Sequence, residues 1–161
     1  MIFRMRRNII LSTPSARSSG FTLIEVVVLT SLIGIVAAFA VPRYTRLANS
    51  VRASEVTALG ANLRQAALTA HAQFLVPGPQ LSAITMRGKT VTLRNGYPDA
   101  TANGIRKAVF DSDGFTVDEG ADFVTFIRAD APSGQQCSVT YQAAPEASRA
   151  ATITVPEISG C

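Results

Sequence analysis

The chain has 161 residues, of which 47% are hydrophobic and 16% charged, and its formal net charge is +4. That length suffices for one small domain and an anchoring segment. Four of the 15 basic side chains lie within residues 1–20, and subtracting them leaves 11 basic side chains against 11 acidic ones in residues 21–161. Overall charge therefore gives no support to nucleic-acid binding, and no nucleic-acid partner is expected.

An apolar run of 21 residues extends from Phe21 to Val41 and is interrupted only by Thr22, Glu25, Thr30, Ser31 and Gly34. As a helix it would reach about 32 Å, which matches the hydrocarbon core of a bilayer. The alternative is a secretory signal peptide with a basic start and the small-residue cleavage site Ala38-Phe39-Ala40. The run is longer than an ordinary signal-peptide core and carries an acid near its start, so the pattern favours a membrane-spanning helix.

Glu25 is the single charged residue inside this run. An ionised carboxylate within a membrane costs a few kcal/mol on insertion scales, so such an acid is by default a functional residue with a partner. We therefore expect the function of the N-terminal segment to depend on Glu25.

The motif Gly20-Phe21-Thr22-Leu23-Ile24-Glu25, followed by a hydrophobic helix with Gly34 and then Pro42, resembles the class III processing signal of type IV pilins and pseudopilins. The resemblance implies that a prepilin peptidase cuts between Gly20 and Phe21 on the cytoplasmic side and methylates the new N-terminal amine of Phe21. It also implies that Glu25 is the glutamate used in filament assembly.

The same resemblance implies a layout for the whole chain. Residues 1–20 would be a cleaved leader, residues 21–41 a transmembrane and filament-core helix, and residues 42–161 a periplasmic or extracellular head. Its partners would be identical or related pilin subunits, the prepilin peptidase and the inner-membrane assembly machinery. The precursor would span the bacterial inner membrane once with its leader in the cytoplasm. Charge alone favours this orientation only weakly, because Arg43, Arg46 and Arg52 follow the apolar run.

Electrostatics supplies a reason for this arrangement. Removal of Gly20 would make the amine of Phe21 a new cation at the membrane face, where Glu25 of a neighbouring subunit can pair with it. Isolated buried charges are expensive, whereas a paired and hydrogen-bonded set is tolerated. We therefore expect Glu25 to set the axial register of a bundle of parallel helices, not to act as a general acid.

A second helical pattern follows the apolar run. Between Arg43 and Phe74, apolar residues recur at steps of three or four or their multiples, at Leu47, Val51, Leu59, Leu63, Ala67, Ala70 and Phe74. We predict one long helix from Phe21 to Phe74, bent at Gly34 and Pro42, because proline removes a backbone hydrogen bond. Pro77-Gly78-Pro79 is expected to end it.

Short β-like runs dominate the rest of the chain. They are Thr90–Leu93, Phe123–Ile127, Cys137–Tyr141 and Thr152–Val155. Asn95-Gly96 after the first run signals a turn, and residues 101–110 carry the spacing of a short helix. We predict an α+β fold in which the long helix packs against an antiparallel β-sheet.

The two cysteines, Cys137 and Cys161, predict a disulfide in an exported domain. A closed loop of this length would stabilise the fold by about 3 to 4 kcal/mol in the chain-entropy model. Reactive or metal-binding thiols are the alternative, but the chain has one histidine and no CxxC motif.

The C-terminal half adds a second resemblance. Asn95-Gly96-Tyr97-Pro98-Asp99-Ala100, Gly104-Ile105, Cys137-Ser138-Val139-Thr140-Tyr141 and Cys161 are similar to the major pilins of mannose-sensitive haemagglutinin (MSHA) pili. In type IV pilins the disulfide-bounded segment is the exposed, variable region, which here would be residues 137–161.

Enzyme chemistry has little support, and neither a cofactor nor a metal is expected. His71 lies within the helical pattern, which favours a structural or solvated role, and no serine motif, phosphate-cradling loop or zinc spacing is present. Asp111-Ser112-Asp113-Gly114, with Asp118, Glu119 and Asp122 downstream, could suit calcium, but lacks the EF-hand spacing and is equally explained by acidic turns.

Three functions remain open. The favoured hypothesis is a pilin that polymerises through its N-terminal helix into an extracellular filament for adhesion and motility. The second is a pseudopilin of a type II secretion system, and the third is a soluble periplasmic binding domain released after Ala40. Cys161 and the Tyr97-Pro98 neighbourhood favour the pilin over the pseudopilin.

Overall fold

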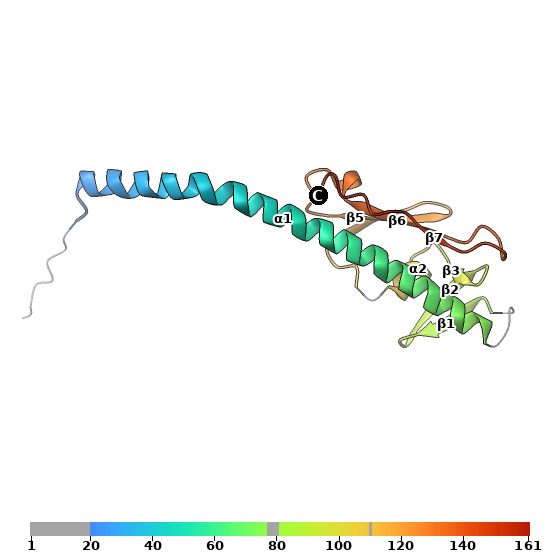
Figure 1. Ribbon diagram of the computed structural model, residues 1–161. Helices are drawn as coiled ribbons and strands as arrows, with labels where there is room; N and C mark the ends of the chain where they lie inside the picture. The colour runs from blue at the N-terminus through green and yellow to red at the C-terminus, as the bar shows by residue number, and fades with distance from the viewer. Residues whose placement is uncertain (1–19, 77–80, 110) are drawn as a thin grey trace, which may run out of the picture. The chain divides into compact units, whose positions relative to one another are not determined.

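The structure is a computed structural model that describes residues 20–76, 81–109 and 111–161 (Figure 1). The expected leader up to Ser19 and the expected helix terminator Pro77-Gly78-Pro79 lie outside the described residues. Contacts between residues divide the chain into two compact units, Met1–Val41 and Pro42–Cys161. Helix α1, Leu23–Leu75, contributes to both units.

In the first unit, α1 carries the apolar run, and every described residue of this unit is exposed. Helix α1 continues past both Gly34 and Pro42. The predicted long helix is therefore confirmed, with its start at Leu23 and its end at Leu75.

In the second unit, one stripe of α1 is buried against the sheets. Its members are Val56, Leu59, Gly60, Leu63, Ala66, Ala67 and Ala70. Gly60 permits a close approach, since a β-carbon there would lie 3.2 Å from Cγ of Pro156. The expected stripe is wrong at its beginning, because Leu47 and Val51 are exposed. Ala53 is the earliest hydrophobic α1 residue packed against the core, and Leu47 and Val51 precede it.

The first sheet is antiparallel with the order β1-β2-β3, formed by Ala83–Met86, Lys89–Arg94 and Tyr97–Pro98. The Asn95-Gly96 turn is confirmed, because both residues have positive φ (55° and 80°) and Arg94 pairs with Tyr97. This is the pattern of a two-residue type I′ hairpin. Arg87-Gly88 repeats it between β1 and β2, with φ of 51° and 75°.

The second sheet is antiparallel with the order β4-β5-β6-β7. Its strands are Phe115–Glu119, Phe123–Arg128, Ser138–Gln142 and Thr152–Ile153. The predicted strands correspond to β2, β5, β6 and β7. Strands β1, β3 and β4 were not predicted from the sequence, which indicated one sheet where the structure has two. The predicted short helix is the single turn α2, Ile105–Ala108, and a 3₁₀ turn, η1, spans Gly134–Gln136.

Both sheets and the second half of α1 share one hydrophobic core (Figure 1). Val91 of the first sheet, Phe126 of the second and Leu63 of α1 are all fully buried in it. A polar contact also joins the sheets: the buried Tyr141 hydroxyl donates a hydrogen bond of 2.6 Å to the Pro98 carbonyl. Burial is the main cause that raises the pKa of Tyr141, so this hydroxyl keeps its proton. The α+β architecture is confirmed.

We predict that Tyr141→Phe lowers the free energy of unfolding by about 1–3 kcal/mol, because the Pro98 carbonyl is left buried without a donor. Urea unfolding of the full chain in detergent, followed by circular dichroism, measures the change. Tyr44→Phe is the matched control, since Tyr44 is 75% exposed. Equal stability of the two variants would contradict a role for the hydrogen bond in joining the sheets.

Candidate functional site

The expected processing junction lies at the start of the described chain. Gly20 and Phe21 are both exposed and precede the first turn of α1. A β-carbon on Gly20 would meet nothing within 4 Å, and the Phe21 side chain is 73% exposed. No described residue therefore covers the peptide bond between them.

Glu25 has a local structural role that the sequence analysis missed. Its backbone N–H donates to Oγ1 of Thr22 at 3.3 Å, and the Thr22 N–H donates to the Glu25 carboxylate at 3.4 Å. These reciprocal contacts form a capping box, which satisfies two N–H groups at a helix N-terminus. The signal was available in the sequence as Thr-x-x-Glu before an apolar run. Both distances are long, so each contact is weak.

Helix α1 includes the one segment among the described residues that is long and apolar enough to cross a membrane. A signal sequence near an N-terminus would pass the same test of length and composition. Within residues 21–41 every side chain is exposed, and Glu25 is the only ionisable one. The first unit thus presents an apolar cylinder with one carboxylate in its first helical turn.

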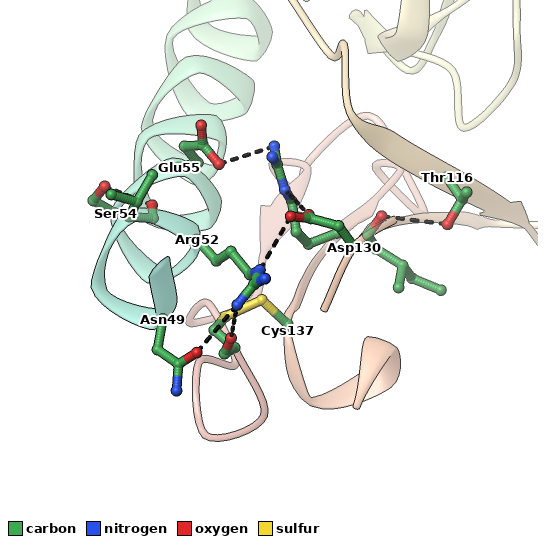
Figure 2. A network of polar contacts seen from close by, with 11 residues as sticks. Asn49, Arg52, Ser54, Glu55, Thr116, Asp130 and Cys137 are labelled. Atoms are coloured by element: carbon green, nitrogen blue, oxygen red, sulfur yellow. Dashed lines mark hydrogen bonds and ion pairs between the residues drawn. A yellow bond between two sulfur atoms is a disulfide. The ribbon is translucent and has the colours of Figure 1, made fainter. Parts of the chain in front are cut away.

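The second unit contains a polar network that sequence reasoning did not find (Figure 2). Asp130 accepts from Arg128 Nε at 2.6 Å and from Arg52 Nε at 3.1 Å. Arg128 also pairs with Glu55 through a 2.9 Å contact. Two arginines therefore face two carboxylates, and the network joins α1 to the end of β5. Arg52 and Asp130 are separated by 78 positions in the chain, so no local pattern could reveal their contact.

The disulfide lies next to this network, as Figure 2 shows. Cys137 and Cys161 are bonded, as predicted, with their Cα atoms 4.8 Å apart. Arg52 Nη1 donates to the Cys161 carbonyl at 3.2 Å and to Oδ1 of Asn49 at 3.1 Å. One guanidinium thereby ties the disulfide-bounded segment to α1. Both sulfur-bearing residues are buried, which favours a structural role for the bond.

His71 and two of the acidic residues considered for calcium, Glu119 and Asp122, have structural partners. His71 is half-buried, donates Nδ1–H to the Gly96 carbonyl at 3.0 Å and stacks on Tyr97 with ring centroids 4.1 Å apart. The acidic residues after α2 do not converge: Asp122 pairs with Arg94 and Glu119 with Arg106. In the part of the chain that the structure describes, no group of three or more His, Cys, Asp or Glu residues is arranged to hold a metal ion.

Comparison of the chain with protein-family models, curated proteins and solved structures finds no match.

Asp130 provides a test of the network in solution. Its hydrogen bonds from Arg128 and then Arg52 lower the pKa of its carboxyl below the ordinary value of 3.8. Ionised Asp130 therefore stabilises the fold above about pH 3.8, and this contribution is lost as the pH falls through the lowered pKa of the folded state.

We predict a titration midpoint for Asp130 below 3.8, shifted upward by Arg128→Gln because that change removes its principal donor. Carbon-13 NMR of the side-chain carboxyl measures it. Arg64→Gln is the control, since Arg64 is exposed and lies outside the network. The assignment of the network fails if both variants leave the midpoint unchanged.

Proposed function

We propose that the chain is a structural subunit of a type IV pilus, similar to the MSHA major pilins. The chain polymerises through residues 21–41 into an extracellular filament for surface adhesion. The observation that carries the proposal is the exposed apolar helix with a single carboxylate in its first turn, directly after Gly20-Phe21. In this role the precursor spans the inner membrane, a prepilin peptidase removes residues 1–20, and the mature chain enters the filament.

The exposure of residues 21–41 supports assembly. An apolar helix without cover is stable only in lipid or against other apolar surfaces. A bundle of identical helices supplies that cover once a subunit leaves the membrane. The disulfide and the polar network suit a head that must stay folded outside the cell.

Glu25 supports a defined register within the bundle. Its carboxylate accepts one weak capping contact from its own chain, and this leaves acceptor capacity for a second subunit. After cleavage, the Phe21 amine of a neighbour is the cation that can pair with it. A displaced neighbour would leave both charges without partners in an apolar bundle, and that penalty selects one axial register.

The first experiment is mass analysis of the N-terminus of protein sheared from intact cells. N-methyl-Phe21 in the sheared fraction supports the pilin. The same terminus found only in membranes favours a pseudopilin. A chain that begins at Val41 in the periplasm would support a cleaved secretory signal and refute the proposal.

We predict that Glu25→Gln is processed normally but yields at least about 30-fold less filament. Truncating one partner of a buried charge pair costs about 2–5 kcal/mol, and the lower figure corresponds to that factor. Gln keeps an oxygen that can accept the capping contact from Thr22, so the variant removes the charge alone. Glu25→Ala, which removes both, is the comparison. Quantified shear fractions give the yield, and normal piliation with Gln would leave Glu25 only its capping role.

We predict that Gly20→Glu blocks the cut, because a charged side chain would occupy the position next to the scissile bond. Full-length precursor should then accumulate in the inner membrane. Gly20→Ala is the matched control and should retain partial processing. Immunoblots of membrane fractions distinguish the two chain lengths. Unchanged processing of both variants would place the cut elsewhere.

A further inference from the structure

The second unit exposes an apolar face on α1 before the sheets begin to cover the helix. Tyr44, Leu47 and Val51 are 75%, 62% and 45% exposed. They are spaced i, i+3 and i+7, which places them on one side of a helix. We call these three residues the 44–51 face. A groove of about 330 Å³ runs along it, and the polar network contributes Arg52, Arg128 and Asp130 to its lining.

Lipid is a poor cover for this face. Residues 21–41 already provide the roughly 20 helical residues that a bilayer core requires. Leu47 and Val51 follow Val41 by six and ten residues, or about 9 and 15 Å of helix. Tyr44 suits the membrane interface, but the other two side chains extend into water.

A positive charge, that of Arg43, lies at one end of the 44–51 face. Arg43 is exposed, and within the described residues it forms no hydrogen bond or ion pair. It precedes Leu47 by four positions, so the two side chains are neighbours on the helix. A partner for the face should therefore be apolar and carry a negative charge at one end.

The first unit of another copy has this pattern. Glu25, Val26, Leu29 and Ile33 have the same spacing as Arg43, Tyr44, Leu47 and Val51, with each residue offset by 18 positions. Eighteen residues are five complete helical turns, or about 27 Å of rise. A parallel copy displaced by that distance brings a carboxylate level with Arg43 and an apolar residue level with each member of the face.

We propose that the 44–51 face is the docking site for residues 25–33 of a second copy, with Glu25 of that copy paired to Arg43. The inference rests on the proposed function and adds a specific neighbour to it. A carboxylate can accept from more than one donor, so Glu25 can bind the Phe21 amine of one neighbour and Arg43 of another. The interface is heterologous, and such contacts generate open filaments when the operation does not close.

Cysteine cross-linking tests the register. In Leu29→Cys/Leu47→Cys the two positions of one chain are separated by about 27 Å of helix, so a disulfide between them must join two copies. We expect a ladder of covalent multimers in sheared filaments after mild oxidation. Leu29→Cys/Leu68→Cys is the control, because Leu68 is an exposed leucine of α1 outside the face. Filaments that carry N-methyl-Phe21 but give no ladder would overturn the interface and leave the pilin proposal intact.

Two further variants keep the test decisive if the double cysteine chain does not assemble. Arg43→Gln should reduce filament yield about tenfold, whereas Arg46→Gln should not, although Arg46 is also exposed and without a described partner. Equal yields overturn the pairing.

Leu47→Cys should react with a membrane-impermeant maleimide in spheroplasts and be protected in filaments. Protection in spheroplasts would show that lipid covers the face. Failure of the unmodified chain to yield N-methyl-Phe21 would instead refute the pilin proposal, and the inference with it.

Discussion

The free energy of the exposed apolar helix governs the rest of this protein. Residues 21–41 present a continuous apolar surface in which Glu25 is the one ionisable group, and no described residue of the chain covers it. Water is an unfavourable environment for that surface, and lipid is unfavourable for the carboxylate. A bundle of identical helices suits both the apolar surface and the carboxylate. It buries the apolar residues, and it can supply a cation to Glu25. This balance is the physical basis of the proposed assembly.

The second unit, in contrast, buries most of its apolar residues within one chain. A short stripe on α1, centred on Leu59 and Leu63, packs beneath two small sheets, and the Tyr141 hydroxyl bridges them. The disulfide closes the C-terminal segment, and Arg52 binds that segment to α1. The polar network lies where the sheets begin to cover the helix. Leu47 and Val51, which precede the network on α1, stay exposed.

The two roles of Glu25 are compatible in physical terms. In a single chain the carboxylate accepts the Thr22 N–H and helps to begin α1. In the proposed filament it pairs with cations of other copies. Apolar surroundings strengthen that electrostatic interaction because their dielectric constant is low. The capping box also holds the carboxylate in the first helical turn. Local helix initiation and longitudinal register would then depend on the same side chain.

Sequence alone determined the features that depend on local periodicity and local chemistry: the long helix, the Asn95-Gly96 turn, the strands β2, β5, β6 and β7, and the apolar run with Glu25. From the two cysteines and the expectation of an exported domain, it also predicted the disulfide. Three strands were missed: β1, the two-residue β3, and β4, whose Asp118 and Glu119 are poor strand formers. Leu47 and Val51 were assigned to the core because periodicity cannot tell where a covering sheet begins. Only the tertiary structure decided the separation into two sheets and the contact between Arg52 and Asp130, since both depend on residues far apart in the chain that meet after packing.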